Sequence, residues 1–212
     1  MSKYIDISYV EEYLGEKFTK DTTPSISQVS KYLDLAESNF ERIAGDWTLQ
    51  TGQVDIVDSY FNGEYVYFKT TKFPLSSITS VEVQQGTRFD PSWSTLATDE
   101  YVIEDAEQGM VYLSIGIKGT KQYQVTYDSG YLFDDVPYNI KYTVFLMTMR
   151  EIFSNTMFAS NGNLDGSTEI IDVDVYREIT KGGNPYNGLQ AIDSVIQDSL
   201  SLINKKTQIF IF

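Results

Sequence analysis

The feature that most constrains the fold is a strongly apolar stretch directly after Pro137. Its apolar residues are Ile140, Val144, Phe145, Leu146, Met147, Met149 and Phe153. Proline fixes φ for a first helical turn and lacks the amide donor that such a turn leaves unused, so a helix is predicted to begin here. Apolar groups cover most of its circumference. We therefore expect this helix to be covered on more than one side, either by its own sheet or by a neighbouring subunit.

The residues before this proline predict a strand that leads into the helix. Within Tyr123–Tyr127, aromatic and aliphatic residues alternate with polar ones, which is the period of a half-buried strand. The alternation stops near Gly130. A loop that contains the adjacent acids Asp134 and Asp135 then connects the strand to the proline.

Two helices are predicted nearer the amino terminus. The first lies near residues 8–14, where Ser8 and Glu11 fit a capping box. The second runs from Ser25 to Gly45 and is amphipathic. Its apolar residues recur at steps of three and four: Ile26, Val29, Leu33, Ala36, Phe40 and Ile43.

Between these helices and Pro137 the pattern is that of consecutive strands with short turns. Residues Gln53–Phe61 and Glu64–Thr70 flank Asn62-Gly63, and Asn-Gly is the preferred pair for a two-residue type I′ hairpin turn. Thr87–Thr98 is predicted to be a loop. Such a run of strands predicts an antiparallel meander or small barrel, and helices on both sides of it indicate the α+β class.

The predicted organisation of the 212 residues has four parts. These are N-terminal helices (1–46), an antiparallel β-rich domain (47–130), a buried helix that packs with the N-terminal helices (131–155), and a loop, strand, amphipathic helix and C-terminal tail (156–212). The strand of the last part is expected at Ile170–Ile179.

The composition argues against several functions. The chain has 30 acidic and 16 basic residues, a formal charge of −14, and neither cysteine nor histidine. Binding to nucleic acid requires Lys and Arg to neutralise phosphates, so this charge disfavours it. Without Cys or His, thiolate chemistry and the commonest general base are excluded. We predict no enzyme and no cofactor. A signal peptide or membrane span is not recognised, so a soluble, intracellular protein is expected.

One segment has the spacing of a calcium-binding loop. Asn161, Asn163 and Asp165 are followed by Asp172 at the twelfth position. The first ligand is Asn and the last is Asp rather than a bidentate Glu, and a strand pattern follows instead of a helix. A turn-rich loop without metal is therefore the favoured interpretation, and no metal site is predicted.

The chain ends in four residues of high strand propensity: Ile209, Phe210, Ile211 and Phe212. Exposed at a chain end, such residues would promote aggregation. They are predicted either to form an edge strand of their own domain or to dock onto a partner's sheet or groove. The 16 Tyr and 12 Phe residues also indicate extensive contacts between subunits.

Six stretches, in order, carry a family resemblance: YVEEYLG, SQVSKYLDLAESNFERIAG, FPLSSITSVEV, GMVYLSI, QVTYDSGY and VPYNIKYTVFLMTM. Together they resemble the head–tail connector (adaptor) proteins of tailed bacteriophages, over residues 4–153. Tyr142, Thr143, Phe145 and Met147 replace the small residues common in that family's buried helix.

The resemblance implies a virion protein that forms a ring of about twelve subunits between portal and tail, through which DNA passes. It implies contacts with further copies, the portal, and tail or stopper proteins. The expected subunit interface is Tyr142, Phe145, Leu146, Met149 and Phe153. Asp134 and Asp135 are expected to face the channel. The alternatives are another virion ring component (a stopper or tail-completion protein), or an enzyme or carbohydrate-binding module built on the β-rich middle.

Overall fold

The computed structural model describes residues 2–85, 90, 92–114, 119–159 and 185–208. The chain divides into two compact units: a helical unit, Met1–Gly45 with Val136–Phe212, and a β unit, Asp46–Asp135. The predicted α+β class is confirmed, since helices and an antiparallel sheet are both present.

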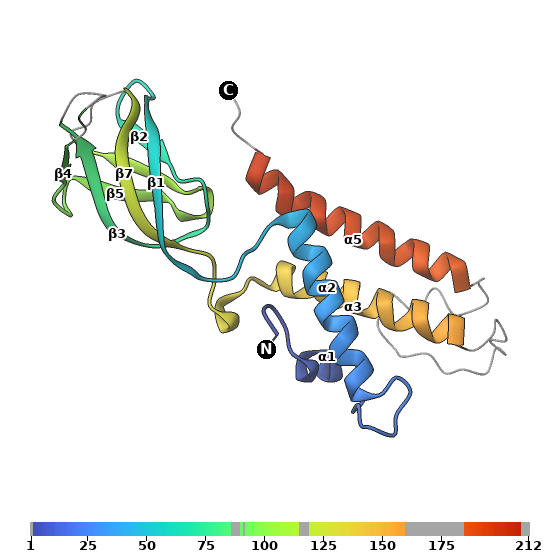
Figure 1. The fold of residues 1–212 in the computed structure, drawn as a ribbon. Helices are drawn as coiled ribbons and strands as arrows, with labels where there is room; N and C mark the ends of the chain where they lie inside the picture. Colours follow the sequence, from blue (N-terminus) through green and yellow to red (C-terminus); the bar gives the residue numbers. More distant parts are fainter. Residues whose placement is uncertain (1, 86–89, 91, 115–118, 160–184, 209–212) are drawn as a thin grey trace. The chain divides into compact units, whose positions relative to one another are not determined.

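The helical unit is built around its third helix. Its described helices are α1 (Ile7–Leu14), α2 (Ile26–Ala44), α3 (Tyr138–Ala159) and α5 (Pro185–Gln208). Helix α3 packs against both α2 and α5, and α2 also contacts α1 and α5 (Figure 1). The β unit, although it lies between α2 and α3 in sequence, does not separate these two helices in space.

The first helix begins one residue earlier than the sequence predicts, because a different residue caps it. Asp6 is the N-cap, and its carboxylate accepts a hydrogen bond from the Tyr9 amide at 2.9 Å. Ser8, the predicted cap, instead donates its hydroxyl to Asp6 at 2.7 Å. Acidic and hydroxyl side chains serve equally well as caps, so the capping-box pattern at Ser8 does not exclude Asp6 as the N-cap.

Helix α2 has the predicted start and buried stripe, except at its ends. The Gln28 side chain accepts a hydrogen bond from the Ser25 amide at 2.8 Å, which is one half of a capping box. Four stripe residues are buried: Val29, Leu33, Ala36 and Phe40. Ile26 and Ile43, predicted in the same stripe, are 40% and 43% exposed. They lie in the first and last turns, so the neighbouring helices cover only the middle of the stripe.

The β unit contains one antiparallel sheet of seven strands. The strands are β1 (Gln50–Phe61), β2 (Val66–Lys69), β3 (Leu75–Gln84), β4 (Trp93–Thr95), β5 (Tyr101–Asp105), β6 (Met110–Leu113) and β7 (Gly119–Ser129), with short 3-10 helices η1 (Ala106–Gln108) and η2 (Phe133–Asp135). Their order is β4-β3-β7-β1-β2-β6-β5, so the last strand lies between β1 and β3. Strand β4 lies inside the predicted loop Thr87–Thr98. The sequence does not predict this strand, because it forms by pairing with β3, which is a tertiary contact. The sheet curls (Figure 1).

The loop between β1 and β2 is longer than the predicted two-residue turn. The last residues of the ladder are Phe61 and Val66, and within the four-residue loop Asn62–Tyr65 the Asn62 amide donates to the Tyr65 carbonyl at 3.2 Å. The Asn62 side chain accepts hydrogen bonds from the amides of Glu64 and Tyr65 at 3.0 and 2.8 Å. These side-chain bonds stabilise a wider loop than the Asn-Gly pair alone predicts.

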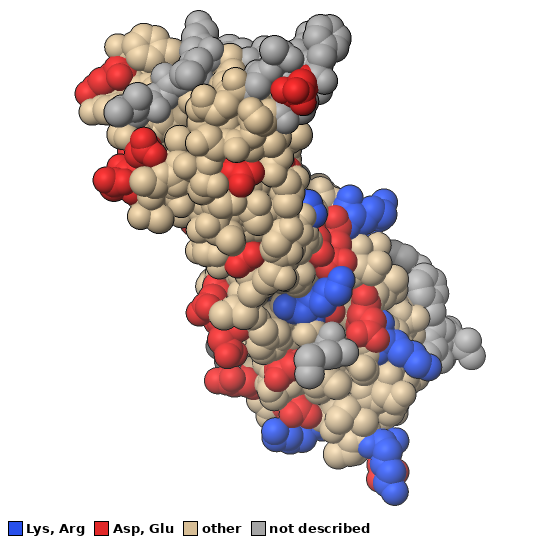
Figure 2. Space-filling model, turned by 60° about the vertical axis from the view of Figure 1, so that its left-hand side comes forward, with Lys and Arg blue, Asp and Glu red and all other residues tan. Residues whose placement is uncertain are grey.

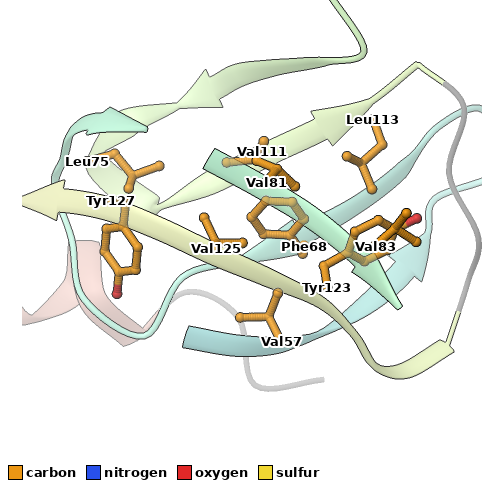
Figure 3. Packing of buried hydrophobic residues seen from close by; sticks show 10 residues of the cluster. All are labelled: Val57, Phe68, Leu75, Val81, Val83, Val111, Leu113, Tyr123, Val125 and Tyr127. Carbon is orange, nitrogen blue, oxygen red and sulfur yellow. The ribbon is translucent and has the colours of Figure 1, made fainter. Parts of the chain in front are cut away.

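One face of the sheet holds the core of the β unit. Alternate residues of several strands meet there, in accordance with the two-residue period of a strand (Figure 3). The core residues are Val57, Phe68, Leu75, Val81, Val83, Val111, Leu113, Tyr123, Val125 and Tyr127. Val125 is paired with both Asp55 on β1 and Val81 on β3, which puts the predicted Tyr123–Tyr127 strand at the centre of the sheet.

Candidate interaction surfaces

The predicted interface residues of α3 differ in their exposure. Phe145, Leu146 and Met149 are 0%, 1% and 1% exposed within the chain's own helical unit. Tyr142 and Phe153 are partly buried. The expectation that a sheet or a neighbouring subunit must cover this helix is therefore wrong. Helices α2 and α5 of the same chain cover it, and three of the five residues offer no surface to a partner.

Aromatic rings of α1 complete this cover. The ring centroids of Phe145 and Tyr13 lie 4.6 Å apart, and the ring of Tyr9 packs edge-on to Phe145. The hydroxyls of Tyr13 and Tyr138 are hydrogen-bonded to each other. Burial raises the pKa of Tyr9 to about 12, and burial together with the bond to Tyr138 raises the pKa of Tyr13. These tyrosines stay neutral near pH 7 and add no charge to the helical unit.

The two ends of the β unit's chain are held together by backbone pairing. The Tyr131 amide donates to the Trp47 carbonyl at 2.9 Å, and the Leu49 amide donates to the Tyr131 carbonyl at 2.9 Å. The rings of Trp47 and Tyr131 stack with centroids 6.3 Å apart. Gly130 has φ +92, and a Cβ there would lie 2.1 Å from the Thr48 carbonyl oxygen. The Gly-Tyr of the QVTYDSGY stretch therefore has a structural role.

The two acids that follow this junction are exposed. Asp134 and Asp135 lie in η2, next to Leu132 and Phe133, which are 57% and 39% exposed. This short segment combines negative charge with exposed apolar groups on the surface of the β unit.

The outer face of the sheet carries a row of aromatic residues that sequence analysis missed. The tyrosine row consists of Tyr60, Tyr65, Tyr67 and Tyr112. Ring centroids are 5.7 Å apart for Tyr60 and Tyr67, 6.1 Å for Tyr67 and Tyr112, and 5.5 Å for Tyr65 and Tyr112. Strand pairing places Tyr60 opposite Tyr67, and Tyr67 opposite Tyr112. The tyrosine count was the available signal, but the row appears only once the strand register is known.

An acidic recess of about 400 Å³ lies at one end of the tyrosine row. It is lined by Tyr65, Asp99, Tyr101, Val102, Glu104, Tyr112, Leu113 and Ser114. A hydrogen bond to Glu64 and its charge, with a smaller effect of Glu104, raise the pKa of Tyr65.

Acidic residues dominate the β unit as a whole. Residues 46–135 include 14 Asp and Glu but only 5 Lys and Arg. On the face shown in Figure 2, acidic side chains are scattered over the β unit between uncharged areas. This excess of negative charge favours binding of a positively charged partner over binding of nucleic acid, whose phosphates it repels.

Several predicted features fall outside the described residues. These are the calcium-loop positions Asn161, Asn163, Asp165 and Asp172, the strand Ile170–Ile179, and the tail Ile209–Phe212. In the described part of the chain, no three or more Asp and Glu residues gather closely enough to hold a metal ion. Among the same residues, no helix has the length and apolar character needed to cross a membrane.

Comparisons with known proteins add no family. Neither a protein-family model nor a curated protein matches the chain.

Proposed function

We propose that this chain is a structural virion protein, the head–tail connector (adaptor) of a tailed bacteriophage. About twelve copies would form a ring between portal and tail, as closed cyclic symmetry allows, and DNA would pass through it without specific binding. Its partners would be further copies of itself, the portal, and tail or stopper proteins. The ring would be assembled in the host cytoplasm and would act without catalysis or a cofactor.

The order of the elements carries this proposal. The six stretches of the family resemblance correspond to α1, α2, β3, β6, the end of β7 and the start of α3. In the fold, α2 and α3 pack together, although the whole β unit lies between them in the sequence. The proposal rests on this order of elements, and the packing of α2 on α3 is consistent with it.

The charge supports the same proposal. A channel that attracted phosphates would retain the genome, whereas an acidic wall repels it and keeps it mobile. Asp134 and Asp135 are exposed and would contribute to such a wall. The contact between copies would use exposed residues, so Phe145, Leu146 and Met149 drop out of the expected interface. Tyr142 and Phe153 stay in it.

The oligomeric state tests the proposal. The full chain, alone and with a phage portal protein, would be examined by mass photometry and negative-stain microscopy. We expect rings of about twelve copies with a central hole. A chain that stays monomeric at its solubility limit and also in the presence of portal would contradict the proposal. A stopper or tail-completion protein would form a ring as well, but it would not bind portal directly.

The tyrosine row favours a second candidate, a carbohydrate-binding module. Aromatic rings beside carboxylates, as at the exposed Tyr65, the partly buried Tyr112 and Glu104, suit the stacking and hydrogen bonding of sugar rings. A glycan array separates the two functions. Specific binding that Tyr112→Ala abolishes would favour the carbohydrate-binding module, whereas a connector should bind none of the glycans.

A further inference from the structure

Strand β5 is an edge strand with backbone groups available for pairing. It is the last strand in the sheet order, and within the described residues only β6 pairs with it. The Ser114 amide donates to the Glu100 carbonyl at 2.8 Å, so Glu100 and Ser114 form a hydrogen-bonded pair. Pairs of this type alternate along an antiparallel ladder, so the backbone groups of Tyr101 and Ile103 point away from β6. An edge of this kind can accept another strand.

The side chains along β5 suit a strand that is apolar and positively charged. Val102 and Ile103 are 56% and 37% exposed. Asp99 and Glu104 are exposed beside them, and Glu104 lines the recess together with Tyr112. An added strand would find apolar contacts along the edge, a carboxylate on either side, and an aromatic recess for a side chain.

The chain itself contains a segment of this chemistry. Lys205-Lys206 is the only pair of adjacent basic residues in the sequence, and Ile209, Phe210, Ile211 and Phe212 follow shortly after it. Helix α5 ends at Gln208, and the apolar run Ile209–Phe212 that follows it has four residues, close to the five of β5. The segment 205–212 thus combines positive charge, strand propensity and a suitable length.

We propose that residues 205–212 of one copy dock onto the β5 edge of a second copy, with Ile209–Phe212 as an added strand and the lysines near one of the two flanking acids, Asp99 or Glu104. The contact joins two different surfaces, so repeating it from copy to copy produces a closed ring or an open filament. As an account of how the ring is joined, the proposal rests on the proposed function. The docking itself requires only a second copy.

Cysteine cross-linking tests the contact cleanly, because the chain has no cysteine of its own. Val102→Cys and a size-tagged Ile211→Cys chain would be mixed and mildly oxidised. We expect the mixed disulfide dimer to exceed both self-paired dimers. Val54→Cys, of the same residue type and 58% exposed on β1, is the matched control and should cross-link poorly with Ile211→Cys. Equal yields with Val54→Cys and Val102→Cys would overturn the proposal.

A single chain with both Val102→Cys and Ile211→Cys distinguishes docking between copies from docking within one copy. Docking between copies predicts a ladder of covalent dimers, trimers and larger species. A cross-linked monomer without a ladder would place the segment on its own chain and would overturn the proposal.

Charge variants test the role of the acids. Asp99→Asn with Glu104→Gln removes the acid at either end of β5 and should lower the yield of the Val102–Ile211 cross-link about threefold, the size expected for one exposed ion pair. Glu12→Gln with Asp34→Asn removes the same charge from exposed positions of the helical unit and should leave the yield unchanged. Equal losses from both double variants would reveal general charge attraction and would contradict docking at β5.

The outcomes for docking and for ring formation are separable. Rings without the cross-link would refute the β5 contact and leave the connector proposal intact. A covalent ladder from chains that never close into rings, with or without portal, would support the β5 contact and refute the connector.

Discussion

The helical unit and the β unit treat their apolar residues in opposite ways. Helix α3 is apolar on most sides, yet Val144 and Phe145 are fully buried by the rest of the helical unit. The sheet packs only one of its faces, and Val54, Ile56 and Tyr60 on β1 are 58%, 53% and 48% exposed. The most apolar stretch of the sequence is therefore a core element. The surface suited to a partner is the outer face of the sheet, although its strands are less apolar in sequence than α3. An interaction site requires that apolar residues be exposed, not only that they be numerous.

The largest effect is expected from α3, where a substitution tests how completely its own chain covers it. Phe145→Ala should lower the free energy of unfolding by about 3–5 kcal/mol, because a buried aromatic side chain leaves a cavity. Urea unfolding would be followed by circular dichroism for the helices and by the fluorescence of Trp47 and Trp93, both in the β unit. A shift in the helical signal alone would identify two independently unfolding units.

The control for this variant is an apolar residue of the same unit that faces solvent. Leu202 on α5 is 63% exposed, so Leu202→Ala should change the free energy of unfolding by less than about 0.5 kcal/mol. A small effect of Phe145→Ala, similar to that of Leu202→Ala, would mean that α3 is not enclosed by its own chain.

The next largest effect is expected at the junction of the β unit. Gly130→Ala should destabilise it by about 2–4 kcal/mol, because the new Cβ would clash with the Thr48 carbonyl and the residue would keep a positive φ. Gly63→Ala is the matched control, since Gly63 has φ +104 with open space around it. It should cost about 1 kcal/mol from backbone strain alone. Equal costs, measured by tryptophan fluorescence in urea, would contradict the close approach.

A smaller effect is expected from a buried hydroxyl in the sheet core. The Tyr127 hydroxyl donates to Asp55 at 2.6 Å and accepts from the Lys72 amide at 3.1 Å. Tyr127→Phe leaves both partners without this bond and should cost about 1–3 kcal/mol. Tyr60→Phe alters a ring that is 48% exposed on the opposite face and should be close to neutral. Similar costs for both would mean that the two faces of the sheet do not differ as described.

Sequence reasoning succeeded where the signal is local. Pro137 marks the start of α3, Ser25 the start of α2, and the alternation in Tyr123–Tyr127 marks a central strand. These features depend on residues a few positions apart. The cover of α3 by α5 and the tyrosine row depend on which distant elements pair. A periodic pattern shows that a face is buried without naming its partner, so the sequence predicts cover by a sheet or a neighbouring subunit where the chain's own α2 and α5 are sufficient.

The smallest effect is expected in the pH dependence of stability. Here a single buried carboxyl group, rather than packing, distinguishes the helical unit from the β unit. Glu37 on α2 is 5% exposed, and its carboxylate accepts the amides of Lys3 and Tyr4 at 2.7 and 3.0 Å. Burial raises its pKa above the ordinary value of 4.5, despite the opposing effect of these hydrogen bonds. The folded chain then binds this proton more tightly than the unfolded chain does. Its contribution to stability is therefore fully present below the unfolded pKa and is lost as pH rises through the folded pKa.

Glu37→Gln removes this titration while keeping an oxygen that can accept from both amides. The variant should lose part of the pH dependence of the helical transition above pH 4.5, measured by circular dichroism in urea. The tryptophan transition of the β unit should keep its own pH dependence, since Glu37 lies in the other unit. An unchanged helical pH profile would mean that the hydrogen bonds from Lys3 and Tyr4 compensate fully for burial. A parallel change in both transitions would mean that the helical unit and the β unit unfold as one.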